Sequence, residues 1–272
     1  MRAVGELGKL FLEIRRRHFG LWLVGALNLV LALVFLGLIP LDSRTVTGLN
    51  VWIKPFKFAV SVGVYLWTVA WFLPYLRVSN WLARTLGWVV AVAMLFENLL
   101  IFSQALRGTS SHFNFATAYD GSIFSAMGAM ILINSVLAAI LMVLYLARPG
   151  DIPRSYLWGI RLGYLFLLLG SAVGGMMIGH GAHTLGAADG GPGLPFLGWS
   201  TAAGDFRPAH LIGLHGLQVL PLVGYWFSRR RDWTAARQTA ALFAFSAAYV
   251  LLGLLLLGLA LTARPLLSYS FL

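Results

Sequence analysis

Four of the six histidines in the sequence fall in one stretch, which joins two apolar segments through a glycine- and proline-rich connection. Imidazole binds haem iron, zinc and copper, and it carries protons near neutral pH. The chain has no cysteine, so thiolate ligands and disulfides are excluded. Segment 170–218 is therefore the first candidate for a chemical site, and its histidines are His180, His183, His210 and His215.

The spacing of these histidines predicts which of them share a face. His210 and His215 are five residues apart, which corresponds to about 140° on a helix. His180 and His183 are three apart and would share a face if one helix continued through both. The pair predicted to face the interior is His180 and His215, with His183 and His210 at the rim. A fifth histidine, His112, follows another apolar segment.

A second candidate feature is a polar stripe on the segment before His112. Glu97, Gln104, Arg107 and Ser111 follow one another at spacings of seven, three and four residues, which is typical of one helical face. Glu97 is predicted near mid-membrane, where ionisable side chains usually serve function. The alternative is a structural carboxyl hydrogen-bonded to asparagines of neighbouring segments, namely Asn28, Asn98 or Asn134.

The elements that position these residues follow from composition, which is 59% hydrophobic and only 11% charged. So much apolar surface requires lipid as the solvent, and spans inside lipid must be helical. Residues 1–18 are basic and contain apolar residues at helical spacing, which predicts a short interfacial helix. The competing interpretation is a signal peptide, but the apolar run that follows is long enough to span and has no small-residue cleavage site, so it is predicted to be an uncleaved first span. We therefore expect an all-α polytopic membrane protein, a seven-helix bundle over 19–272. Its spans are predicted at 19–39, 55–76, 82–106, 122–147, 156–180, 208–228 and 236–262.

Basic residues predict the orientation of these spans. Seven spans put the termini on opposite sides, and the loops on the N-terminal side contain fourteen of the twenty Lys and Arg residues. Cytoplasmic loops are the basic ones, so the N-terminus is predicted inside and the C-terminus extracytoplasmic. The same distribution accounts for the net charge of +11 without nucleic acid. It also places the loop at 184–207, predicted to fold back as a lid, on the outer side with five histidines.

Three cations on the outer side suggest an anionic group in the site. Lys57, Arg107 and Arg207 could neutralise haem propionates. The alternative is pairing with aspartates or lipid headgroups. Glycines before His180 are likewise consistent with a porphyrin lying against the backbone or with close helix packing alone. The aspartates that could instead pair with the three cations are Asp120, Asp189 and Asp205.

These features favour an integral membrane redox protein, in a bacterial inner membrane, with haem b near the outer side. His180 and His215 would be axial ligands, while Glu97 and Gln104 exchange protons with a quinol. One alternative is a zinc, copper or iron enzyme, and another is a proton-coupled transporter or small-molecule-binding protein that uses Glu97. In a third, the histidines only satisfy buried carbonyls. The metal alternative uses His112, His180, His183, His210 and His215.

Overall fold

The computed structural model describes residues 2–267, and within them the chain is helical apart from connecting loops and four two-residue strands. Seven of the helices are long and apolar enough to cross a membrane, which confirms the predicted spans within a few residues. Met1 and residues 268–272, which the predicted domains include, lie outside the described residues. The seven helices are α2 (Phe19–Leu38), α3 (Ile53–Phe72, extended by the 3-10 turn Leu73–Tyr75), α4 (Asn80–Leu106), α5 (Ala118–Ala147), α6 (Arg154–His180), α7 (Arg207–Ser228) and α8 (Ala235–Leu261).

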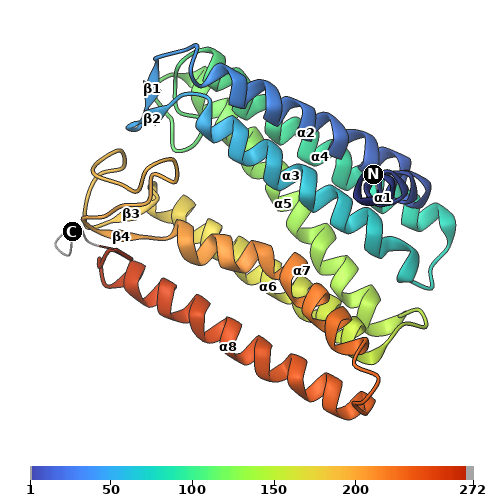
Figure 1. Ribbon diagram of the computed structural model, residues 1–272. Helices are drawn as coiled ribbons and strands as arrows, with labels where there is room; N and C mark the ends of the chain where they lie inside the picture. Colours follow the sequence, from blue (N-terminus) through green and yellow to red (C-terminus); the bar gives the residue numbers. More distant parts are fainter. Residues whose placement is uncertain (1, 268–272) are drawn as a thin grey trace. The chain divides into compact units, whose positions relative to one another are not determined.

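The helices of the chain fall into two compact units (Figure 1). Unit 1 contains α1 (Arg2–Arg17) and α2 to α5. Unit 2 contains α6 to α8 together with two segments from earlier in the chain. Those segments are Arg44–Asn50, which forms the hairpin β1 (Thr45–Val46) and β2 (Leu49–Asn50), and His112–Phe115.

Side-chain caps determine where three helices of unit 1 begin. His18, Ser79 and Thr117 have extended backbones, and each accepts a hydrogen bond from a backbone N–H in the first turn of α2, α4 and α5 respectively. Such caps satisfy N–H groups that have no partner within the helix. At one end of unit 1, the Arg77 N–H donates to the Arg148 carbonyl at 2.9 Å, so the loops after α3 and α5 are paired.

Helix α1 packs on unit 1 through its C-terminal half. The Arg17 guanidinium donates to the Trp71 carbonyl at 2.6 Å and pairs with Glu13 on its own helix at 2.9 Å. The Phe11 ring meets Trp22 and Trp67 edge-on, with centroids 5.1 and 5.7 Å apart. The predicted N-terminal helix is therefore present, and its location at a membrane interface stays a prediction.

Glycines bring α6 and α7 into backbone contact in unit 2. A Cβ added at Gly170 would lie 2.6 Å from the Leu214 nitrogen, and one at Gly159 would lie 2.6 Å from the Leu220 oxygen. A Cβ at Gly213 would meet the Gly170 backbone. Small residues allow such close approach of membrane helices. Helix packing therefore accounts for Gly170, the first of the glycines that could have lined a porphyrin.

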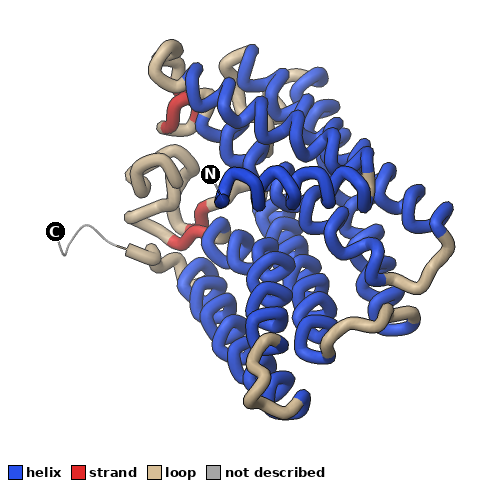
Figure 2. Tube along the Cα trace, turned by 45° about the vertical axis from the view of Figure 1, so that its right-hand side comes forward, coloured by secondary structure: helices blue, strands red, loops and turns tan. Residues whose placement is uncertain are grey.

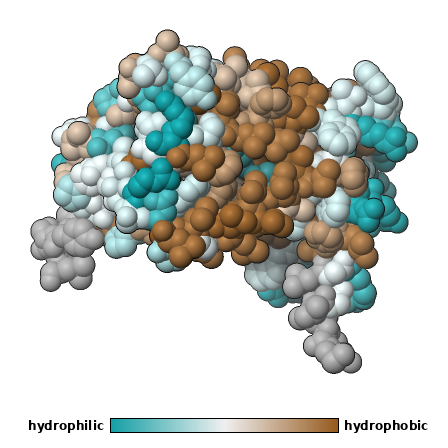
Figure 3. Space-filling view, turned by 90° about the horizontal axis from the view of Figure 1, so that it is seen from above, coloured by the Kyte–Doolittle hydropathy of each residue, from teal (hydrophilic) through white to brown (hydrophobic). Residues whose placement is uncertain are grey.

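Apolar side chains also cover the outer surfaces of the helices. Leu33, Leu222 and Leu251 are each at least 65% exposed, as expected for residues that face lipid. The face seen in Figure 3 has a hydrophobic band with polar residues at both of its ends. The short strands, red in Figure 2, lie in the connecting segments and not in the helical layer.

Candidate functional site

Segments from three separate parts of the chain meet in unit 2. A Cβ at Gly48 would lie 2.9 Å from the Gly190 carbonyl oxygen, and Gly48 has a φ of +76° that suits glycine. The Phe113 ring meets the His183 ring edge-on, with centroids 4.9 Å apart. Loops predicted on one side of the membrane are thus gathered in one unit, and they are residues 44–50, 112–115 and 181–206.

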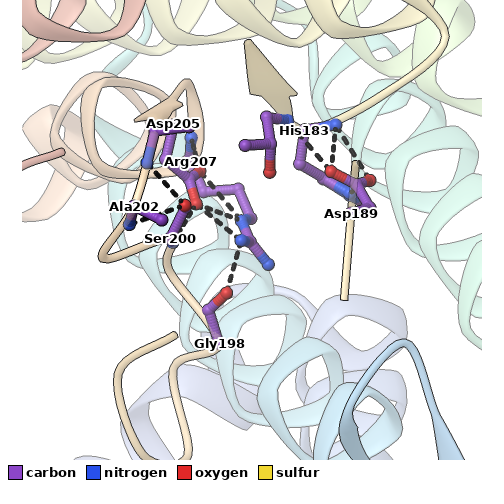
Figure 4. Close-up of polar contacts among 9 residues, drawn as sticks. His183, Asp189, Gly198, Ser200, Ala202, Asp205 and Arg207 are labelled. Atoms are coloured by element: carbon purple, nitrogen blue, oxygen red, sulfur yellow. Dashed lines mark hydrogen bonds and ion pairs between the residues drawn. The ribbon is translucent and has the colours of Figure 1, made fainter. Parts of the chain in front are cut away.

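His183 is held by the carboxylate of Asp189 within the longest of these loops (Figure 4). The two groups are 2.6 Å apart, from Nδ1 of His183 to Oδ2 of Asp189. The same carboxylate accepts the backbone N–H groups of His183 and Thr184 at 3.0 Å each. Burial raises the pKa of Asp189, but the hydrogen bonds from the His183 ring and backbone outweigh it and hold that pKa below its usual range.

His180 and His183 would share a helical face only if one helix continued through both, and the structure shows that it does not. Helix α6 ends at His180 because Gly181 adopts the left-handed conformation, with φ +74°. The His180 ring is exposed, and its Nε2 donates to the Thr184 carbonyl at 3.1 Å. The prediction that His180 faces an interior therefore does not match its exposed position, while His183 belongs to the loop beyond the helix.

His210 occupies the contact between α6 and α7. Its Nδ1 donates to the Gly170 carbonyl at 2.7 Å, and a Cβ at Gly174 would lie 3.1 Å from its Cε1 atom. His183 and His215 lie near enough to act on it electrostatically. His215 is half-buried one turn further along α7. His210, which was predicted at the rim, is therefore the histidine packed between two helices.

The loop that contains His183 and Asp189 is closed by a short antiparallel β-hairpin. Strands β3 (Thr184–Leu185) and β4 (Gly204–Asp205) pair antiparallel, and α7 begins at Arg207. Asp205 accepts the Ser200 N–H at 2.8 Å and the Arg207 N–H at 2.9 Å (Figure 4). The Arg207 guanidinium pairs with the same carboxylate at 2.5 Å and also donates to the Gly198 carbonyl at 2.5 Å. Arg207 thus closes the loop onto the start of α7.

The predicted cations are divided between the two units. Arg107 in unit 1 donates to Asp120 and to Gln104, at 2.5 Å in each case. Gln104 is fully buried and donates to the same Asp120 oxygen at 2.9 Å. Lys57 lies in the second turn of α3, also in unit 1. The aspartate pairing that we considered is therefore observed for Arg107 and Arg207, and only Arg207 belongs to the unit that contains the five histidines.

Glu97 lies in the middle of α4 and is 1% exposed. Its Oε2 atom has no hydrogen-bond partner among the residues that the structure describes. The asparagines considered as its partners bond elsewhere, since Asn98 donates to Asn28 and Asn134 accepts from a tyrosine hydroxyl. The predicted stripe stops before Ser111, because α4 ends at Leu106.

Sequence reasoning did not identify Asp189 as the partner of His183 or the Gly170 carbonyl as the partner of His210. The sequence signal for the His183–Asp189 contact is an aspartate six residues after a histidine in a glycine-rich loop. Between residues 2 and 267, no group of three or more His, Asp or Glu side chains could hold a metal ion. Comparison of the chain with protein-family models, curated proteins and solved structures found no match.

Proposed function

We propose that this integral membrane protein is a redox protein that binds haem b in unit 2 through His183 and His210. The observation that carries the proposal is that one nitrogen of each ring is already fixed. His183 Nδ1 is held by the Asp189 carboxylate, and His210 Nδ1 by the Gly170 carbonyl. Histidines that bind metals commonly donate their other N–H to a carboxylate or backbone carbonyl, which fixes tautomer and ring direction.

This donor set of two imidazoles would suit haem, because haem iron needs only one or two protein ligands and imidazole is a common one. In the neutral tautomer that donates from Nδ1, Nε2 carries the lone pair that a metal needs. Bound haem would supply one-electron chemistry. The residues of the chain orient the ring nitrogens, while Arg207 and Asp205 keep the adjoining loop closed. The proposed electron partner is a quinol, an apolar donor that reaches such a site from the bilayer.

The proposal is tested by reduced-minus-oxidised absorption spectra of the purified protein, expressed with haem supplied. We expect a b-type spectrum in the wild type, and its loss or a shift in both His183→Ala and His210→Ala. His180→Ala is the matched control, because His180 is exposed at the end of α6, whereas His210 is packed between α6 and α7. Size-exclusion profiles establish that each variant is folded. A wild type without a Soret band contradicts the proposal. A spectrum that is lost in His180→Ala but retained in the other two variants would show that His180, and not His183 or His210, binds the haem, and it also contradicts the proposal.

We further propose that the N-terminus is cytoplasmic, that α1 lies at the inner interface and that the host membrane is a bacterial inner membrane. The predominance of Lys and Arg in alternate loops supports this orientation. The absence of cysteine permits a direct test with single exposed cysteines. Ala187→Cys should react with an impermeant maleimide added outside intact cells, and Asp232→Cys should react only after lysis. The opposite labelling pattern contradicts the orientation.

A further inference from the structure

Glu97 has a property that the haem proposal does not use. Of the nine acidic residues in the sequence, it alone lies in the middle of a candidate span. The side chain is 1% exposed, and its buried Oε2 atom has no hydrogen-bond partner within residues 2–267. A buried carboxyl that stabilises structure ordinarily has its oxygens bonded, since an unsatisfied polar atom costs about 1–3 kcal/mol. The unpartnered Oε2 atom of Glu97 therefore points to a bound group.

The surroundings of this carboxyl limit what the ligand can be. Asn98, the next residue along α4, is 9% exposed, and its Oδ1 atom likewise has no hydrogen-bond partner in the part of the chain that the structure describes. Even if both oxygens served one site, they would be far fewer than the six to eight that Ca²⁺ takes, and fewer than the near-octahedral set of Mg²⁺. A proton needs only one. An ionised carboxylate at this depth would be costly unless a charged partner accompanied it.

Charged groups on the helices around α4 leave Glu97 without an ion pair among the described residues. Lys54, in the first turn of α3, is near enough to act on Glu97 electrostatically and has interactions of its own. Asp120 of α5 is paired with Arg107. Helix α2 contains no charged residue. The remaining charged group of α3, Lys57, has interactions of its own.

We propose that Glu97 is a proton-binding site within unit 1, neutral in the resting protein and able to release and regain its proton. On release, the O–H bond breaks, the electron pair stays on the carboxylate, and the proton passes to water or buffer. The Lys54 ammonium then acts on the new negative charge. Proton binding at Glu97 requires no haem, so the experiments that test it are independent of those that test the histidine site. A protonatable Glu97 would allow the protein to take up and release a proton during its function.

Infrared spectroscopy of the reconstituted protein tests this directly. A protonated carboxyl has a C=O band distinct from that of a carboxylate. We expect the band in the wild type at neutral pH, its disappearance as the pH is raised, and its absence from Glu97→Gln at every pH. Asp232→Asn is the matched control, because that carboxyl is exposed in a loop and its removal should leave the band unchanged. No band at neutral pH, or one that persists until the protein denatures, overturns the proposal.

Chemical labelling provides a second and independent readout. An apolar carbodiimide reacts with protonated carboxyls in a bilayer and forms a stable N-acylurea that mass spectrometry can locate. We expect modification at Glu97 that slows as the pH rises. If sodium chloride at constant pH removes the infrared band and slows labelling, whereas choline chloride does not, the site binds a metal cation and the proton proposal is wrong.

Discussion

The contact between His183 and Asp189 can be tested by removing the carboxylate in Asp189→Ala. The change leaves three donors without their acceptor: the His183 ring, the His183 N–H and the Thr184 N–H. Hydrogen bonds to charged groups contribute about 1.5–3 kcal/mol each. Because the Asp189 side chain is 20% exposed, water replaces part of this loss. We therefore expect a net destabilisation of roughly 2–4 kcal/mol.

Thermal unfolding in detergent, followed by tryptophan fluorescence, measures this effect. At about 2–4 °C of Tm per kcal/mol for a chain of this size, a loss of roughly 2–4 kcal/mol should lower the Tm by roughly 4–16 °C. Asp189→Asn keeps an acceptor oxygen but not the charge, so it should lose about half as much. Asp232→Ala, at an exposed loop carboxylate, is the control and should leave the Tm unchanged.

The stabilisation that Asp189 contributes should depend on pH in one direction. The pKa of Asp189 is held low in the folded protein, so its contribution to stability is complete above the unfolded value of about 4. The contribution is lost as the pH falls below that value, and wild type and Asp189→Ala should converge in acid. Equal Tm values for Asp189→Ala and Asp232→Ala at neutral pH would refute the reasoning.

Three further predictions concern packing and charge in both units. Asp205→Asn removes the charge that pairs with Arg207 and should cost about 3 kcal/mol in a denaturant titration; an unchanged midpoint contradicts the buried ion pair. Burial lowers the pKa of His18, so its contribution should be lost as the pH falls below about 6.5, and His18→Gln should abolish that slope. Gly213→Ala should destabilise by roughly 1–3 kcal/mol through contact with the α6 backbone, whereas Gly253→Ala, with its nearest neighbour at 3.8 Å, should not.

The helices could be predicted from the sequence because a bilayer requires about twenty apolar residues per span. Their ends depended on local signals that are readable in principle, such as the caps Ser79 and Thr117. The division into two units could not be predicted, because it depends on contacts between distant segments. Residues 44–50 illustrate this, because they belong to unit 2 whereas the helices before and after them belong to unit 1.

The candidate site was predictable in its location but not in its pairings. Histidine spacing and the positive-inside rule indicated one group of loops, and five histidines do belong to unit 2. Which ring faces which partner depended on Gly181, whose left-handed conformation ends α6 and places His183 in the loop. Helical phase assumed a continuing helix, so it assigned His180 to an interior that the exposed ring does not occupy.

The most direct test of the haem proposal is the molar ratio of haem to protein, measured by the pyridine haemochromogen method on purified wild type and on His183→Ala/His210→Ala. The proposal predicts about one haem b per wild-type chain and essentially none in the folded double variant, as expected when both histidines that would hold the haem are removed. A wild type without stoichiometric haem after expression with haem supplied, or a double variant that retains it, would contradict the proposal.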